Sequence, residues 1–135
     1  MVTLSRVSAA LSTTFSAQFP ASNCIDNNPS TLCATNRESG AWLSVKLEPA
    51  SVSYVAVLNR GDDLSYMAWL SPFEIWAGSS FGDTSGSAVR CGVLDVPPAI
   101  GPFVAACGGV QRGYVTLRQI GEARYLTIAE LVAYA

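Results

Sequence analysis

The sequence contains no histidine, and Lys46 is the single lysine among its eight basic residues. Histidine is the side chain that most often serves as a general base and as a metal ligand, so its absence removes most familiar catalytic and zinc-binding arrangements. Charged residues make up only 13% of the chain, and the formal net charge is −2. A chain without a basic surface lacks the electrostatic attraction that nucleic acid requires. We therefore expect no nucleic-acid partner.

Other signals of function are missing as well. The ten acidic residues form no sequence pair typical of glycoside hydrolysis, and there is no Ser-His or Cys-His set and no glycine-rich phosphate loop. These absences favour a protein that is not an enzyme. The longest apolar runs, such as Tyr54–Leu58, are too short to cross a bilayer. Residues 1–10 lack the pattern of a signal peptide, so we expect a mature domain or part of a larger secreted or surface protein.

The sequence does contain enough apolar residues to form a hydrophobic core. Its 135 residues are 50% hydrophobic, which excludes a disordered chain and suits one domain over residues 1–135. Segments 42–47, 52–58, 73–77, 113–118 and 125–134 are rich in alternating, β-branched and aromatic residues, as strands are. No long segment has the period of about 3.6 residues that marks an amphipathic helix. The polar stretches 23–40 and 78–87 predict loops, and the whole predicts an all-β antiparallel β-sandwich.

The four cysteines form two neighbouring pairs along the chain. Cys24 and Cys33 are 9 residues apart, and Cys91 and Cys107 are 16 apart, with no C-x-x-C motif. Two local disulfides are the simplest interpretation, although four cysteines allow three pairings and four free thiols in a cytosolic protein are the alternative. Because disulfides persist in oxidising compartments, this interpretation predicts an extracellular or cell-surface protein.

Taken in chain order, several segments resemble the coagulation-factor type C (discoidin) domain superfamily and, within it, the fucolectins or F-type lectins. The resemblance covers nearly the whole chain and implies a galactose-binding-like jelly roll with neighbouring termini and ligand-binding loops at one end. The segments that carry it are 21–31, 41–47, 55–62, 70–78, 113–117 and 125–134, with Cys91 and Cys107 before the fifth of them.

The resemblance to fucolectins also implies a Ca²⁺ site between the polar loop and the last strand. Calcium binds about six to eight oxygen atoms from carboxylates, amides and backbone carbonyls. The ion would order the loop at the rim of the ligand site. As an alternative, the loop residues are ordinary turn residues and Glu130 is paired with an arginine. The implied ligands are Asn23, Asp26, Asn28, a residue near Thr35 or Arg37, the carbonyl of Ala129, and Glu130.

The fucose-binding pattern of that family is only partly present. Fucolectins use a histidine, then Arg-x-Asp 27 residues later, and then a further basic residue. Arg60-Gly61-Asp62 matches the middle of this pattern, but Cys33 stands at the histidine position, and Met67 or Trp69 stands at the last basic position. Binding of fucose in the family's manner is therefore not expected.

A remodelled sugar site around the same motif remains a hypothesis. Arg60 can donate to hydroxyls or a carboxylate, and Asp62 can orient it. Tyr66 and Trp69 offer aromatic faces for the apolar side of a sugar ring. The alternative is that Arg60 and Asp62 form a structural ion pair and that Trp69 belongs to the core.

These observations predict a non-catalytic extracellular recognition module that binds a cell-surface or matrix glycan in adhesion and is ordered by calcium. One alternative is a structural or protein-interaction module that has lost sugar binding. Another is a phospholipid-binding discoidin domain that inserts the apolar segment 64–70. Asp62 and Asp63, with no lysine nearby, oppose attraction to anionic lipid, so membrane insertion is not favoured.

Overall fold

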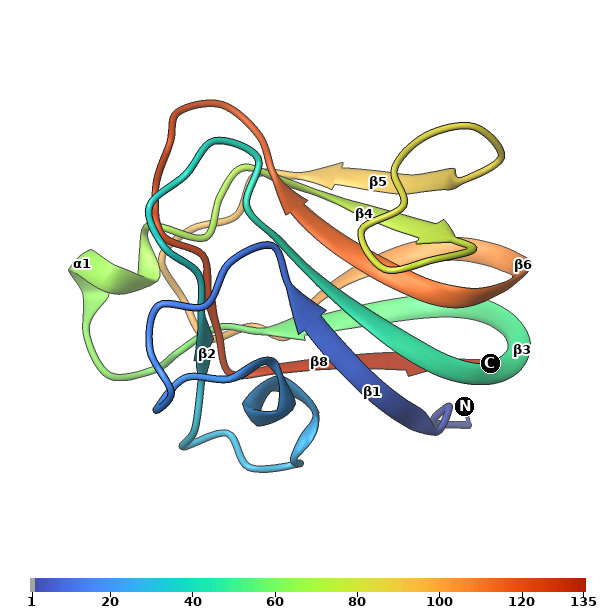
Figure 1. The fold of residues 1–135 in the computed structure, drawn as a ribbon, viewed down its shortest axis with the longest axis horizontal. Helices are drawn as coiled ribbons and strands as arrows, with labels where there is room; N and C mark the ends of the chain where they lie inside the picture. Colours follow the sequence, from blue (N-terminus) through green and yellow to red (C-terminus); the bar gives the residue numbers. More distant parts are fainter. Residues whose placement is uncertain (1) are drawn as a thin grey trace.

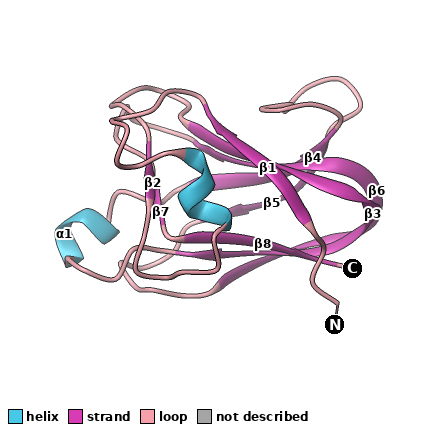
Figure 2. Cartoon of the chain, turned by 60° about the horizontal axis from the view of Figure 1, so that its bottom comes forward, coloured by secondary structure: helices cyan, strands magenta, loops and turns pink. Residues whose placement is uncertain are grey.

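Strands dominate the computed structural model, which describes residues 2–135 (Figures 1 and 2). The all-β antiparallel sandwich predicted from the sequence is confirmed. Within the described residues, no helix is long and apolar enough to cross a membrane. In chain order the elements are β1 (Arg6–Leu11), the 3-10 helix η1 (Ala21–Ile25), β2 (Cys33–Ala34), β3 (Trp42–Leu58), α1 (Leu64–Met67), β4 (Phe73–Gly78), β5 (Val89–Leu94), β6 (Phe103–Gln119), β7 (Thr127–Ile128) and β8 (Glu130–Tyr134).

Two long antiparallel strands, β3 and β6, run through both layers of the sandwich. The first part of β3 pairs with β1 and with the end of β6, whereas its last part pairs with β8 and with the start of β6. The pairing of β3 with β6 shifts register between Lys46 and Ala50, around Pro49, which has no N–H to donate. In Figure 1 both strands curve around one edge of the molecule. Segments 42–47 and 52–58, expected as two strands, are therefore one bent strand.

The remaining strands extend the first layer. β4 pairs with the end of β6, and β5 pairs with β4, giving the order β1-β3-β6-β4-β5. The segment expected as one strand over 125–134 is divided: β7 pairs with β2 in a small separate sheet, and β8 pairs with β3. The strands β1 and β5 and the first half of β6 were not predicted, and the short strand β2 lies within the stretch 23–40 that was expected to be a loop.

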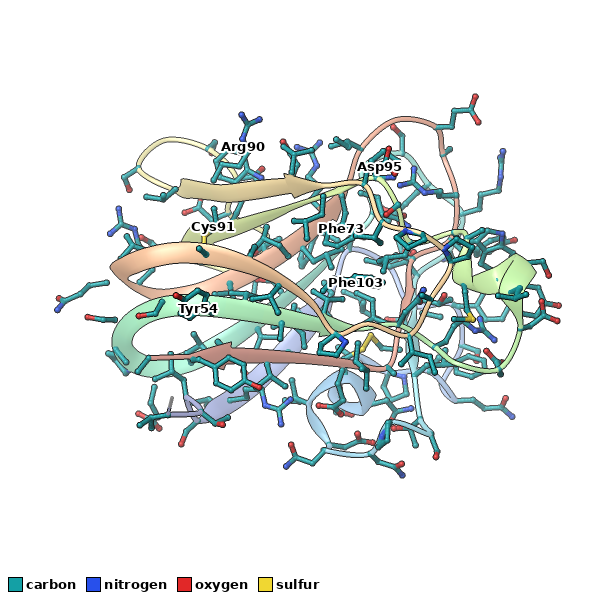
Figure 3. All side chains as sticks on the ribbon, turned by 180° about the vertical axis from the view of Figure 1, so that it is seen from behind. Tyr54, Phe73, Arg90, Cys91, Asp95 and Phe103 are labelled. Carbon is teal, nitrogen blue, oxygen red and sulfur yellow. A yellow bond between two sulfur atoms is a disulfide. The ribbon has the colours of Figure 1, made fainter. Side chains whose placement is uncertain are left out.

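The core lies between the layers, and the residues that fill it alternate along the strands. Val45, Val57, Ile75 and Leu117 have no exposed surface, and each such side chain contributes roughly 1.5–3 kcal/mol on burial. Phe73 of β4 is also fully buried, and Figure 3 places it between the layers.

Both predicted disulfides are present, and all four cysteines are used. Cys24–Cys33 joins η1 to β2 and clamps the polar loop between them. Cys91–Cys107 ties β5 to the first half of β6, and Figure 3 shows its sulfur atoms between these strands.

The predicted closeness of the chain ends is also confirmed. The amide of Ala135 donates to the carbonyl of Val2 at 2.8 Å. In Figure 1, α1 and β2 lie at the end of the sandwich opposite the termini. The loops at that end position the site described next.

Candidate functional site

A cavity of about 340 Å³ opens among the loops at the α1 end of the sandwich. Its volume lies at the small end of the range for small-molecule sites, about 300–1,000 Å³. Three of the four residues predicted for ligand binding line this cavity, together with residues from three other segments; the fourth, Asp62, lines an adjoining cavity instead. The lining residues are Phe15, Phe19, Leu32, Ala34, Arg60, Tyr66, Trp69, Tyr125 and Thr127.

Five aromatic rings follow one another along the cavity wall. The centroids of Tyr66 and Trp69 are 4.9 Å apart, and those of Trp69 and Tyr125 are 5.1 Å apart. Phe15 meets Tyr125 edge-on at 5.8 Å and lies 6.1 Å from Phe19. Tyr66 is 41% exposed and Phe15 is 52% exposed, so these two rings keep surface that a ligand can contact. Trp69 lines the cavity half-buried, instead of belonging to the core as the alternative held.

Among the described residues that line the cavity, Arg60 alone carries a charge. Its Nε and Nη2 each donate to the carboxylate of Asp62 at 2.7 Å, a bidentate pair, and its Cζ lies 4.7 Å from the centroid of the Tyr66 ring. The hydrogen bond from Arg60 lowers the pKa of Asp62, and the same bond raises the pKa of Arg60. Within residues 2–135 the guanidinium Nη1 of Arg60 has no hydrogen-bond partner, so it is available to a ligand.

Asn59, which sequence analysis missed, fixes the start of the Arg60 loop. Its buried side chain donates to the carbonyls of Met67 at 3.0 Å and Ala99 at 3.2 Å, and its Oδ1 accepts from the Arg60 amide at 2.9 Å. Its place as a polar residue directly after a buried strand is the sequence feature that could have identified Asn59. Asp63 then caps α1 by accepting from the amide of Ser65, which fixes the single helical turn that carries Tyr66.

Two further residues that were not predicted from the sequence, Gln119 and Arg124, fix the backbone of Trp69 by donating hydrogen bonds to its carbonyl. Gln119 donates from Nε2 to the carbonyls of Trp69 at 2.8 Å and Tyr125 at 3.2 Å. Arg124 donates from Nε to the same Trp69 carbonyl at 2.7 Å and from Nη2 to that of Pro72 at 2.6 Å. The desolvation that accompanies these contacts lowers the pKa of Arg124.

The residues implied as calcium ligands are only partly brought together. Asp26 and Asn28 form turns within the loop, where Asp26 Oδ1 accepts from the Asn28 amide at 2.9 Å. Glu130 Oε1 accepts from the Asp26 amide at 3.1 Å. Thr35 is engaged away from the loop, since its Oγ1 accepts from the Leu126 amide at 3.0 Å. The backbone carbonyl of Asn23, the atom implied as a ligand, accepts from the Thr31 hydroxyl at 3.4 Å, and the Asn23 side-chain amide donates to the carbonyls of Gln18 and Leu32. The Ala129 amide donates to the Leu58 carbonyl, which fixes the backbone beside Glu130.

An arginine occupies the place where a cation would meet Glu130. Arg6 Nη1 donates to Glu130 Oε2 at 2.6 Å and to the carbonyl of Leu131 at 2.8 Å, while Nη2 donates to Asn27 Oδ1. Burial raises the pKa of Glu130, and the neighbouring Asp26 acts in the same direction, whereas Arg6 opposes both. With Arg6 paired to Oε2 and the Asp26 amide to Oε1, the Glu130 carboxylate already has a cationic partner, and within the described residues no group of three or more His, Cys, Asp or Glu side chains could hold a metal ion. Calcium binding stays a prediction from the resemblance.

No protein-family model and no curated protein sequence matches the chain. Solved structures do match. A fucolectin from the serum of the striped bass, Morone saxatilis, superposes with a TM-score of 0.81 and 27% identity over 93% of this chain, which spans 45% of the fucolectin chain.

Two shorter carbohydrate-binding structures match over nearly their whole length. The lectin domain of lectinolysin, complexed with Lewis B antigen, gives a TM-score of 0.79 and 21% identity, covering 94% of this chain and 91% of the other. The family 32 carbohydrate-binding module of NanJ from C. perfringens, in complex with galactose, gives a TM-score of 0.76 and 21% identity. This match covers 95% of this chain and 93% of the NanJ module. The resemblance predicted from the sequence is therefore confirmed: the chain has the galactose-binding-like β-sandwich fold of the discoidin-like superfamily and is similar to the fucolectins.

Proposed function

We propose that the chain is a non-catalytic carbohydrate-binding module and that the aromatic cavity at the α1 end holds a sugar ring. The observation that carries this proposal is the cavity itself, in which an arginine with a free donor stands beside a continuous aromatic wall. The fucolectin, the lectinolysin lectin domain and the NanJ module support it, since all three are lectins or carbohydrate-binding modules with this fold.

The chemistry of the cavity suits one face of a pyranose. The exposed rings of Tyr66 and Phe15 provide apolar surface for the C–H side of the ring. Arg60 supplies a donor for a hydroxyl or carboxylate. The exposed carboxylate of Asp62 lines the adjoining cavity that shares Arg60, where it can accept from a further hydroxyl of the ligand. The ligand therefore combines an apolar face with adjacent polar groups, as sugars do.

The two disulfides support an extracellular or secreted location for this activity. Adhesion to a cell-surface or matrix glycan is the biological role that we propose for it. The proposed function does not include calcium, because Arg6 is paired with the Glu130 carboxylate that the ion would need.

A glycan array with four proteins tests the proposal. The wild type is compared with Arg60→Ala and Tyr66→Ala, and Phe81→Ala serves as a matched control. Phe81 is 39% exposed and packs on Tyr114 away from the cavity, so its exposure nearly equals the 41% of Tyr66. We expect the two cavity variants to lose at least about tenfold in affinity, roughly 1.4 kcal/mol, and the control to bind like the wild type.

Two results would contradict this function. One is wild-type protein that binds no glycan on the array. In that case, retention on anionic liposomes would favour the phospholipid alternative. The other is glycan binding that survives in both cavity variants, which would place the sugar elsewhere on the molecule.

A further inference from the structure

We propose that Arg6 replaces calcium in this chain, so that a guanidinium instead of a metal ion holds the polar loop 23–31 against β8. The proposal concerns how the loop at the rim of the site is ordered. It does not depend on the identity of any ligand.

The contacts of Arg6 join two segments that are far apart in the sequence. From β1, the guanidinium reaches Glu130 at 2.6 Å and the Leu131 carbonyl at 2.8 Å, both in β8, and also the side chain of Asn27 in the loop. The side chains of Arg6 and Glu130 are each only 7% exposed. A planar fork that binds a carboxylate, a carbonyl and an amide oxygen gathers the same classes of oxygen that calcium binds.

A change of register in β1 turns Arg6 toward this position. Arg6 pairs with Leu47 and Ser8 pairs with Lys46, so one extra residue, Val7, is accommodated between them. Such a bulge re-aims the side chains on either side of it. Val7 is 49% exposed, whereas the Arg6 side chain is buried against Glu130.

The side-chain oxygens of Asp26, Asn28 and Glu130 already accept hydrogen bonds from the chain itself. Asp26 accepts from the Asn28 amide at 2.9 Å and from the Thr31 hydroxyl at 2.5 Å, and Asn28 Oδ1 accepts from the Ser30 amide at 2.9 Å. Both oxygens of Glu130 are also used, one by Arg6 and one by the Asp26 amide. A calcium ion placed here would lie beside a buried guanidinium, and two cations sharing one carboxylate repel each other.

The ordered loop forms part of the rim next to the aromatic cavity. Residues Pro29 to Leu32 line a second cavity of about 330 Å³ together with Arg60, Gly61 and Asp62. Leu32 and Arg60 also line the aromatic cavity, so the two spaces share a wall. Arg6 thus supports the ligand site through the loop, and we expect the site to keep its shape in the absence of calcium.

Thermal unfolding of the full chain tests the proposal. We expect the wild-type melting temperature to be the same in millimolar CaCl₂ and in EDTA, because no ion is bound whose loss would destabilise the folded state. We expect Arg6→Ala to lower it by about 10 °C, because Glu130 is left buried without its partner. The matched control is Arg90→Ala, which removes an ion pair to Glu74 at 3.3 Å whose arginine is 55% exposed; a loss below about 3 °C is expected.

A wild-type melting temperature that rises by several degrees in calcium and falls in EDTA would overturn the proposal. So would an Arg6→Ala variant that loses no more than Arg90→Ala. If Arg6→Ala does not fold, Arg6→Lys replaces it: lysine keeps the charge but lacks the fork, so a smaller loss than for the alanine is expected, and no loss at all overturns the proposal. Because melting requires no glycan, these results stand whether or not the proposed function holds.

Discussion

Arg124 supports the aromatic cavity from behind, and replacing it is predicted to loosen the Trp69 wall. Its guanidinium makes four hydrogen bonds of 2.6–2.9 Å to the carbonyls of Trp69, Pro72, Ile120 and Glu122. It therefore ties the segment before β4 to the segment before β7. In Arg124→Ala these two segments lose their direct connection through the guanidinium.

The expected loss of stability depends on which hydrogen bonds each carbonyl keeps when the guanidinium is removed. The Trp69 carbonyl keeps Gln119 Nε2 at 2.8 Å, and the Pro72 carbonyl keeps the Ile120 amide at 3.2 Å, so neither is left unpaired. Water replaces the guanidinium in the loop around Glu122, which is exposed. The loss is then that of two half-buried charged hydrogen bonds, about 3 kcal/mol in the free energy of unfolding.

Urea unfolding measures this loss of unfolding free energy, with one m-value (the slope against urea concentration) used for all variants. The control is Arg112→Ala, whose guanidinium donates to the carbonyls of Gln111 and Ser87 outside the cavity and whose removal is expected to cost about 1 kcal/mol or less. Arg124→Ala should also weaken glycan binding, because Trp69 is no longer fixed. If Arg124→Ala costs no more than Arg112→Ala, the role assigned to Arg124 is refuted.

Two further predictions concern the disulfide and the Arg60 pair. Replacing Cys24 and Cys33 together by serine opens a loop with a sequence separation of 9 and should cost about 2.6 kcal/mol in urea unfolding; a loss below about 1 kcal/mol would contradict the loop-closure argument. The hydrogen bond from Arg60 holds the pKa of Asp62 below its ordinary 3.8, so the stabilisation from this pair is complete above about pH 4 and is lost as pH falls through the lowered pKa. An NMR titration should show this pKa returning toward 3.8 in Arg60→Ala, and an unchanged pKa would refute the pairing.

The strands and disulfides could be predicted because their causes are local. Alternation marked β4 and the first half of β3, a run of β-branched and aromatic residues marked the second half of β3, and the cysteine spacing favoured Cys24–Cys33. The continuity of β3 through Pro49 could not be predicted, because it depends on pairing with β6 on both sides of the bulge.

The candidate site was predictable only where its residues follow one motif. Tyr66 and Trp69 come shortly after Arg60 in the chain, so they were found together with it. Phe15 and Tyr125 reach the same cavity from remote loops, and no local pattern marks them. Nor does the sequence indicate which arginine meets Glu130, since Arg6 reaches it only when β1 and β8 lie in the folded sandwich.

The most direct test of the central claim, that a sugar binds at the aromatic cavity, is to follow the three tryptophan indole N–H signals by NMR while adding a glycan selected on the array. Trp69 lines the cavity, whereas Trp42 and Trp76 do not. Trp69→Phe assigns the Trp69 signal. A saturable shift of the Trp69 signal, with the Trp42 and Trp76 signals unmoved, is the predicted result. Bound glycan that leaves the Trp69 signal in place would contradict the account.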